Sequence, residues 1–348
     1  MKFSLFHLPT FFPEFHQTEA RFYHEMLEQT DLADALGFHG VWFAEHHFFN
    51  YGGHIPSVPV LGAAVAQRTK RIRIGSGITL IPLQDPIRVA EEYAMLDQLS
   101  GGRLDFGIGR GFQKAEYDAF ERDMADSRAL FEEAHDIILK AWSNERFSHQ
   151  GKFRTIVDLR VIPKPLRQLP PIYVACIFTP ESFEWSGRMG HNLMVVPYAV
   201  PKPEMLIENF RIFREARAAH GITSEPEILA VYHFYCGETA EKAKQEPRDA
   251  MIRYLGAAAA SNLQPAYSEQ YQRYGHLLKG FNAMMDYEGA LYPDRVIFGD
   301  PDQCVERIRQ LKSLGVTNVA LLPNFGGLRH EQIKASLERF AREVMPRC

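Results

Sequence analysis

Three ionisable residues follow directly on an apolar stretch near residue 45. The segment Val41 to Ala44, after Gly40, has the composition of a buried strand, and Glu45, His46 and His47 come next. Successive side chains of a strand point to opposite faces, so at most one of the two histidines faces a pocket at the end of the strand. Imidazole ordinarily titrates between pH 5 and 8, which suits it to moving protons.

Three interpretations of these histidines are open on the residues alone. In the first, they cap backbone groups at the end of a strand. In the second, they bind a metal ion with His54 as a third ligand, because imidazole is a common zinc donor. In the third, one of them is a catalytic acid or base in a pocket walled by Phe43, Phe48 and Phe49. No HExxH motif or cysteine cluster supports the second interpretation, so we expect no metal site.

An arginine follows a second strand-like segment, LDFGIG. Arg110 stands among Gly107, Gly109 and Gly111, and glycines at these positions would let a flat ligand approach the backbone. The spacing is not GxGxxG, and the following FQKAEYDAF does not open a helix cleanly. A Rossmann dinucleotide site is therefore not expected.

Two helix starts carry further groups that suit an anion. Arg128 lies in the first turn of a helix, where the helix dipole disfavours a cation, although pairing with Glu132 is an alternative explanation. Thr179 is a good N-cap, Pro180 suits the first helical position, and Ser182 adds a hydroxyl beside the free N–H groups. Such a helix terminus binds phosphate readily.

These residues must be positioned by the elements around them, and strand-like runs alternate with amphipathic stretches along the chain. The strands are expected at Phe3 to Leu8, Gly40 to Glu45, Arg71 to Leu80, Arg103 to Gly109, Pro171 to Ile177, Asn192 to Pro197, Ile228 to Tyr235 and Asn318 to Pro323. The helices are expected at Glu19 to Leu36, Val58 to Thr69, Pro86 to Leu99, Ser127 to Trp142, Pro180 to Met189, Pro203 to His220, Ala240 to Leu255, Pro301 to Leu314 and Glu331 to Val344.

Eight strands, each with a helix, predict an α/β fold, a single (β/α)8 TIM barrel over residues 1–348. Two segments, near 143–170 and 257–295, are longer than the connection that one strand–helix unit of a barrel needs. Inserts of this length usually cover or shape a site, here at the carboxyl-terminal face. The ends of the strands form the active site of such barrels, which is where the candidate residues lie.

Composition limits the partners. The formal net charge of −4 provides no basic field for nucleic acid or for an anionic membrane. No run approaches about 18 uninterrupted apolar residues, so we expect no membrane span. The four cysteines are well separated in sequence, which fits a reducing, cytoplasmic location.

The chain resembles the bacterial luciferase-like flavin-dependent monooxygenases, most closely the catalytic subunit of bacterial luciferase. The resemblance is carried by MKFSLFHLP, VWFAEHHF, the long run RIRIGSGITLIPLQDPIRVAEEYAMLDQLSGGRLDFGIGRG, DMADSRAL, PIYVAC with FEW, GDPDQCVERI and EVMP. It covers nearly the whole chain apart from 257–295.

This resemblance implies a barrel that binds reduced FMN, adds O2 at the flavin C4a carbon and uses the hydroperoxide to oxidise a small organic substrate. A separate NAD(P)H:flavin reductase would supply the reduced FMN. His46 matches the catalytic histidine of the family. The matched flavin-binding residues are Gly77 and Ile78, which form a non-prolyl cis peptide against the isoalloxazine ring in the family, together with Gly109, Arg110, Arg128, Ala175, Thr179 and Ser182.

The sequence departs from the family pattern in two places. Gly109 stands where luciferase has a reactive cysteine, so thiol-linked behaviour should be absent. The 257–295 segment is shorter and different, so a long-chain aldehyde substrate and light emission do not follow.

Other functions remain open at this point. They are an F420-dependent hydride-transfer oxidoreductase on the same fold, a non-catalytic flavin-binding protein, and a barrel hydrolase, which the absence of a paired carboxylate motif disfavours. The helices in SVPVLGAAVAQ and PIRVAEEYAMLDQL show more apolar surface than one barrel requires. The resemblance to the family implies that these helices form a symmetric dimer, so we expect a homodimer.

Overall fold

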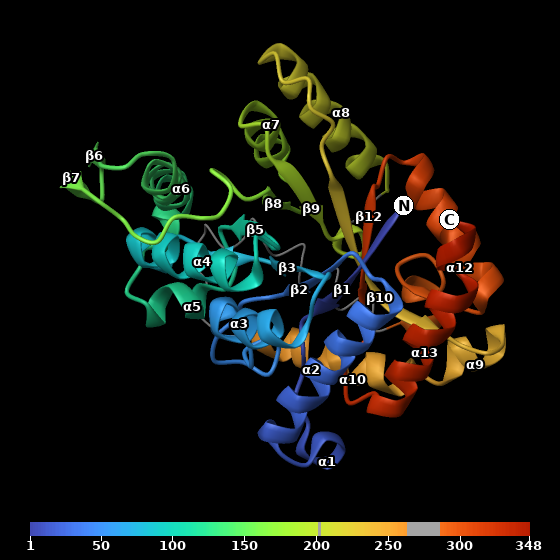
Figure 1. Cartoon of the computed structure of the whole chain (residues 1–348). Coiled ribbons are helices and arrows are strands. Elements are labelled where there is room, and N and C mark those ends of the chain that lie inside the picture. The colour runs from blue at the N-terminus through green and yellow to red at the C-terminus, as the bar shows by residue number, and fades with distance from the viewer. Residues whose placement is uncertain (201–202, 263–285) are drawn as a thin grey trace.

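The fold is a closed barrel of eight parallel strands surrounded by helices (Figure 1). It was obtained as a computed structural model that describes residues 1–200, 203–262 and 286–348. Around the barrel the strands follow the order β1, β2, β3, β5, β8, β9, β10 and β12, and β12 pairs with β1. The predicted (β/α)8 architecture is confirmed, and each predicted strand contributes one barrel strand.

The strands have short, largely buried spans. Their bounds are β1 (Lys2–His7), β2 (Gly40–Phe43), β3 (Arg73–Ser76), β4 (Thr79–Leu80), β5 (Leu104–Gly109), β6 (Phe147–Gln150), β7 (Thr155–Leu159), β8 (Ile172–Cys176), β9 (Asn192–Val195), β10 (Ile228–Cys236), β11 (Ile297–Gly299) and β12 (Asn318–Leu322).

The helices cover the outer surface of the barrel. Their bounds are α1 (Pro13–His16), α2 (Glu19–Leu36), α3 (Val58–Arg68), α4 (Pro86–Ser100), α5 (Lys114–Ala119), α6 (Ser127–Ser143), α7 (Pro180–Arg188), α8 (Pro203–Ala219), α9 (Ala240–Gln245), α10 (Arg248–Asn262), α12 (Pro301–Ser313) and α13 (His330–Glu343), with the short turns η1 (Met124–Asp126), η2 (Pro197–Ala199), η4 (Tyr287–Leu291) and η5 (Met345–Arg347). Among the described residues, no helix is both long enough and apolar enough to cross a bilayer.

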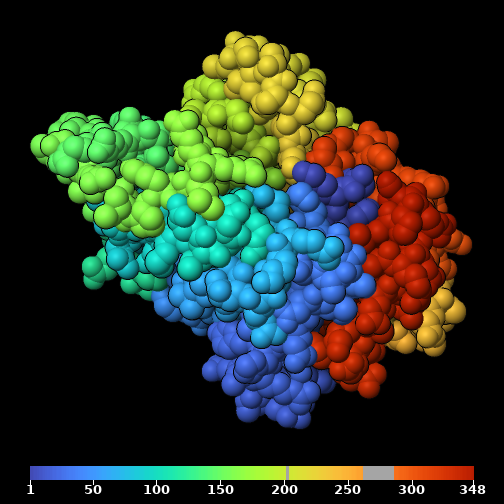
Figure 2. Space-filling view, viewed as in Figure 1, coloured from blue at the N-terminus to red at the C-terminus, as the bar shows by residue number. Residues whose placement is uncertain are grey.

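Closure brings the two ends of the chain together. Ser4 of β1 lies opposite Ala320 of β12, and Ala230 of β10 lies opposite Val195 of β9, so the sheet has no break between its first and last strands. Figure 2 shows the blue N-terminal residues packed beside the red C-terminal helices. Since all eight strands are parallel, their carboxyl ends meet at one face of the barrel.

Large side chains fill the barrel interior at mid-height. The indole of Trp42 lies over Gly75, where a Cβ would approach its ring to 2.2 Å, and it meets the ring of Tyr173 edge-on at 4.7 Å. Toward the amino ends of the strands, Arg73 donates to both oxygens of Asp105, at 2.9 and 2.7 Å. The interior is therefore packed and charge-paired below the carboxyl-terminal face.

Three predicted elements differ from the observed ones. The strand expected at Arg71 to Leu80 is interrupted at the cis peptide Gly77–Ile78, which separates β3 from β4. The helix expected at Ala240 to Leu255 is two helices, α9 and α10, because Pro247 lies between them and proline cannot continue the hydrogen-bond ladder.

The third difference is the insert near 143–170, which contains the antiparallel hairpin β6–β7. The hairpin packs along α6, and its tip is fixed by ion pairs from Lys152 to Asp126 and from Arg154 to Asp85, where α6 and α4 begin. The second insert, 257–295, lies mostly outside the described residues, apart from the end of α10 and residues 286–295.

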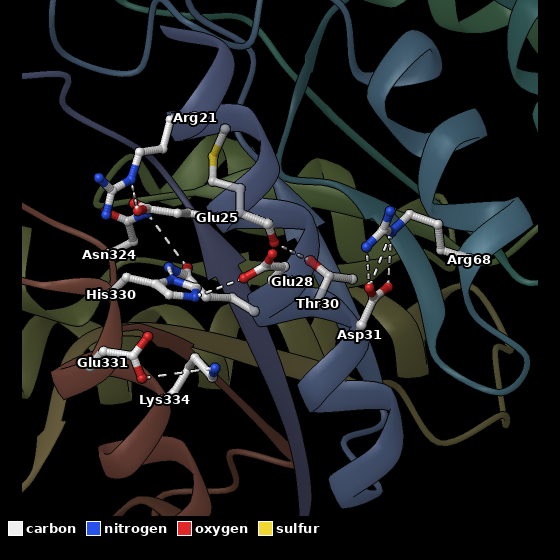
Figure 3. Close-up of polar contacts among 12 residues, drawn as sticks. Arg21, Glu25, Glu28, Thr30, Asp31, Arg68, Asn324, His330, Glu331 and Lys334 are labelled. Atoms are coloured by element: carbon white, nitrogen blue, oxygen red, sulfur yellow. Dashed lines mark hydrogen bonds and ion pairs between the residues drawn. The ribbon is translucent and has the colours of Figure 1, made fainter. Parts of the chain in front are cut away.

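The outer helices are joined by polar contacts as well as by apolar packing. Figure 3 shows Glu28 of α2 facing His330 of α13, with 3.0 Å between Oε2 and Nε2, and Asp31 of α2 facing Arg68 of α3. Both carboxylates are on α2, so this helix is tied to its neighbours on either side. The Asp31–Arg68 pair is exposed, at 36% and 40% of its side-chain surfaces.

Removal of Asp105 should destabilise the fold strongly, because Arg73 would then be left as an unpaired charge inside the barrel. We expect Asp105→Ala to lower the free energy of unfolding by roughly 3–5 kcal/mol. Asp31→Ala is the matched control, and loss of this exposed pair with arginine should cost less than about 1 kcal/mol. Urea unfolding followed by circular dichroism measures both, and equal losses would contradict the importance of the interior pair.

Candidate active site

A cavity opens at the carboxyl-terminal face of the barrel. Its walls come from the ends of seven of the eight barrel strands, β1, β2, β3, β5, β8, β9 and β10, and from the loops after them. Seven of the predicted site residues line it, namely His46, Gly77, Ile78, Arg110, Ala175, Thr179 and Ser182. A smaller adjoining cavity shares Arg110, Ala175 and Ser182 with the first and adds Gly109 and Arg128. The fold thus brings every predicted site residue to this one region.

The imidazole of His46 is held by a buried carboxylate. Its Nδ1 lies 3.0 Å from Oε1 of Glu116, and the same oxygen accepts the backbone N–H of His47 at 3.0 Å. Glu116 is fully buried, and its second oxygen has no hydrogen-bond partner among the described residues. A carboxylate at this position favours the tautomer that donates from Nδ1, which leaves Nε2 of His46 as the proton-accepting nitrogen.

The neighbouring histidine faces elsewhere, as the alternation of a strand predicts. Nε2 of His47 lies 3.2 Å from Oε1 of Glu45, and the ring packs edge-on against Phe120 at 4.8 Å. Glu45 is buried and also accepts hydrogen bonds from the side chain of Gln84 and the backbone N–H of Leu80. Glu45 and His47 therefore belong to the support of the site, and His46 is the histidine that lines the cavity.

The structure separates the three histidines that a metal site would have used. His54 lies against Phe11 and Phe22, and its Nε2 is 3.4 Å from Oε1 of Glu19. Within residues 1–200, 203–262 and 286–348, no group of three histidine, cysteine or acidic side chains is arranged to hold a metal ion.

The predicted aromatic walls are wrong. Phe43 is buried outside the barrel interior, stacked on His7 at 5.3 Å, and Phe48 is 62% exposed. Neither of them lines the cavity, and neither does Phe49. Four of the aromatic residues that do line it come from other strand ends, namely Phe6, Phe112, Phe178 and Tyr198, and the fifth, Tyr51, lies further along the segment after β2. The wall prediction relied on neighbours in sequence, whereas closure brings together residues from distant strands.

One end of the cavity suits an anion. Among the described residues, no carboxylate lies within 4 Å of the guanidinium of Arg110. Thr179 occupies the N-cap position of α7, but its side chain makes no capping hydrogen bond, and Ser182 lies in the first turn. Arg128 is less available to an anion in the cavity, because its Nη1 is 3.8 Å from Oε1 of Glu132 and 43% of its side chain is exposed.

The glycines around Arg110 make room for protein atoms first. A Cβ at Gly107 would lie 1.9 Å from the carbonyl oxygen of Ser76, and a Cβ at Gly109 would lie 2.0 Å from Cδ1 of Ile78. Gly109 therefore lets the side chain of Ile78 pack against β5. The glycines were expected to let a flat ligand approach the backbone; in the structure, the strands themselves also need the space at Gly107 and Gly109.

Glu116 and the two tyrosines of the cavity wall were not predicted from the sequence. The expectation that no helix opens cleanly after Arg110 is wrong, because α5 forms there and carries Glu116. The sequence has a carboxylate, Glu116, six residues after Arg110, but Glu116 is 70 positions from His46. No local pattern joins the two, so only the closed barrel reveals the pair.

The chain is similar to known monooxygenases along nearly its whole length. The model of the luciferase-like monooxygenase family matches residues 1–318. The oxygenase component of the flavin-dependent trigonelline monooxygenase of Acinetobacter baylyi is 30% identical, over 99% of this chain and 95% of the relative. The alkanal monooxygenase alpha chain of the Kryptophanaron alfredi symbiont is 27% identical, over 99% and 98%. The crystal structure of the monooxygenase RslO1 from Streptomyces bottropensis superposes with a TM-score of 0.84 at 31% identity, over 99% of both chains.

Glu116→Ala should loosen the backbone beside His46. The N–H of His47 would lose a charge-assisted bond of roughly 1.5–3 kcal/mol, so its exchange with deuterium should be about 10-fold to 100-fold faster. Glu116→Gln keeps an acceptor oxygen and should have a smaller effect. Amide exchange measured by NMR provides the test. Glu45→Ala is the control, since it should speed exchange at Leu80 and leave His47 unchanged; an unaltered His47 rate in Glu116→Ala would contradict the contact.

Proposed function

The chain belongs to the luciferase-like monooxygenase family, and from this membership we propose that it is the oxygenase component of a two-component system. It would use reduced FMN and O2 to oxidise a small organic molecule, with the reduced flavin supplied by a separate NAD(P)H:flavin reductase. The observation that carries the proposal is one cavity with an anion-binding end at Arg110 and a carboxylate-held imidazole, His46, in its wall. The trigonelline monooxygenase relative, whose name describes an oxygenase component, supports the two-component arrangement. The four free cysteines fit our placement of the enzyme in the cytosol.

The residues present fit a flavin mononucleotide. Arg110, the N-terminus of α7 at Thr179 and the hydroxyl of Ser182 would hold the phosphate, with Arg128 at the periphery. Gly77, Ile78, Gly109 and Ala175 would lie beside the ring system. The bound reduced flavin supplies the electrons and the activation of O2, and one oxygen atom passes to the substrate while the other leaves as water.

The chain's own residues control protons and water around that chemistry. Nε2 of His46 would accept or donate the proton, and Glu116 fixes the orientation of the ring through Nδ1. Phe6, Phe112 and Phe178 make most of the nearby wall apolar, which keeps bulk water from the reacting atoms.

The end of the cavity at Arg110 suits FMN better than F420, the cofactor of the alternative function. F420 has a longer and more anionic tail than FMN, but the second cation here, Arg128, is opposed by Glu132. A non-catalytic flavin-binding protein would have no use for a buried carboxylate at Nδ1 of a cavity histidine. Both features favour the monooxygenase.

Phosphate contacts should dominate the affinity for FMN. Each charge-assisted hydrogen bond contributes roughly 1.5–3 kcal/mol, so we expect Arg110→Ala to weaken FMN binding about 10-fold to 100-fold. Riboflavin should bind to the wild type much more weakly than FMN does. Its affinity should be the same for Arg110→Ala as for the wild type, because riboflavin has no phosphate. Arg128→Ala should weaken FMN binding less, because the Arg128 side chain is 43% exposed and already lies near Glu132. Calorimetric titration of the wild type and both variants with FMN and with riboflavin measures these affinities. Equal affinity of the wild type for the two flavins would show that this end of the cavity does not bind the phosphate.

His46→Ala should impair oxygenation without impairing folding or flavin binding. An acid–base group typically contributes about 10²-fold to 10⁴-fold, so product formation should fall by that order while most O2 is released as hydrogen peroxide. The measurement combines product and peroxide assays with a flavin reductase, NADH and a substrate found by product screening. His24→Gln, at an exposed histidine of α2 outside the cavity, is the control. If His46→Ala formed as much product as the wild type, His46 would have a structural role and no role in oxygenation.

We further propose that the enzyme is a homodimer through α3 and α4, which lie side by side (Figure 1). Val60 of α3 is 73% exposed, and Met95 and Leu99 of α4 are 51% and 47% exposed. Val60→Glu combined with Met95→Glu should convert the dimer to a monomer in light scattering at micromolar concentration. Val157→Glu is the matched control, since Val157 is 79% exposed but lies on β7. A monomeric wild type would contradict the dimer.

A further inference from the structure

Three tyrosines from segments that follow different strands meet near His46. Tyr51 follows β2, Tyr198 lies in η2 after β9, and Tyr254 lies in α10 after β10. At most 4% of each residue is exposed. The ring of Tyr51 is 5.5 Å from the ring of His46 and 5.6 Å from that of Tyr254. Tyr51 and Tyr198 line the cavity, and Tyr254 stands behind them.

A buried histidine completes this tyrosine cluster from inside the barrel. The ring of His233 lies 4.8 Å from Tyr198, 4.6 Å from Tyr254 and 5.5 Å from Phe325. Neither nitrogen of His233 has a hydrogen-bond partner in the described part of the chain, whereas the hydroxyl of Tyr254 is within hydrogen-bonding reach of those of Tyr51 and Tyr198. Buried polar groups are normally satisfied, so an unsatisfied group beside a cavity indicates a polar atom of a ligand or a water.

All four groups are uncharged at neutral pH. Burial lowers the pKa of His233 to about 3 and raises the pKa of Tyr51 to about 12. Burial also raises the pKa of Tyr198 and of Tyr254 well above the usual value for a phenol. The phenols therefore remain O–H donors throughout the physiological range.

The surroundings of the tyrosine cluster decide which acceptor fits. The buried carboxylates of Glu45 and Glu116 lie near His46, so an anionic group on the substrate would be repelled there. Arg110, which has no carboxylate within 4 Å in the part of the chain that the structure describes, lies at the other end of the cavity. A neutral oxygen can accept from the phenols without an uncompensated charge being buried.

We propose that Tyr51 and Tyr198 determine substrate specificity by donating hydrogen bonds to a neutral acceptor oxygen, such as a ketone carbonyl, and so hold the substrate beside His46. This proposal rests on the proposed function, since it assigns the flavin to the Arg110 end. Tyr254 and His233 would orient the two donors from behind.

Four probes of one size test the proposal: acetophenone, ethylbenzene, benzoate and benzylammonium. Their binding to the protein is measured by ligand-observed NMR, with and without oxidised FMN. We expect acetophenone to bind more tightly than benzoate or benzylammonium. Tyr51→Phe and Tyr198→Phe should each weaken acetophenone binding about 3-fold to 10-fold and leave ethylbenzene binding unchanged. Tyr232→Phe, which removes a buried hydroxyl on the opposite face of β10, should change neither.

Phenylalanine preserves the rings, and thermal unfolding checks that each variant folds. Equal losses for acetophenone and ethylbenzene, unchanged acetophenone binding in both variants, or tighter binding of either charged probe would overturn the proposal. Failure of the wild type to bind FMN would overturn the proposed function instead, and the flavin-free comparison would still decide the role of the two phenols.

Discussion

The barrel can hold a cavity at one end because its interior is filled below that cavity, and Trp42 is the largest of the fully buried side chains that fill it. The indole can lie across the interior because Gly75 carries no side chain, since a Cβ there would come within 2.2 Å of the Trp42 ring. Beneath it, the buried Asp105 and the largely buried Arg73, whose side chain is 19% exposed, neutralise each other. The floor of the site is therefore set by the packing of β2, β3 and β5, and the same three strands deliver His46, the Gly77–Ile78 peptide and Arg110 to the face above.

The cavity is polarised along its length. At one end, Arg110 and the start of α7 provide positive potential; elsewhere in the wall, an imidazole is held by Glu116, which is itself buried and bonded to the backbone of His47. Apolar rings separate these groups. A ligand that carries a phosphate at one end and a reactive ring at the other would satisfy both ends at once. Neither group alone would define such an orientation, because an arginine or a histidine at a strand end is common in barrels.

Much of the barrel was predictable because each strand is a short apolar run bounded by turn residues, as in Gly40–Phe43 and Asn318–Leu322. The hairpin β6–β7 was not, since four residues such as Phe147–Gln150 are too few and too polar for a recognisable pattern. Arg110 and Thr179 were predictable from their places at the end of a strand and the start of a helix. Glu116 and Tyr198 were not, because their roles depend on contacts between segments that only closure brings together.

The positions of these residues also separate the common chemistry from the choice of substrate. His46 lies three residues after β2 ends and Arg110 one residue after β5 ends, so the packed strands fix both of them. Tyr198 and Tyr254 lie in short or long helices after β9 and β10, where the chain can change without moving a strand. If the flavin occupies the strand-end groups and the substrate the loop groups, relatives about 30% identical can keep one reaction and differ in what they oxidise. The tyrosine cluster would then help to set which substrate this chain oxidises, whereas the charge-paired interior beneath it supports the barrel whichever substrate is bound.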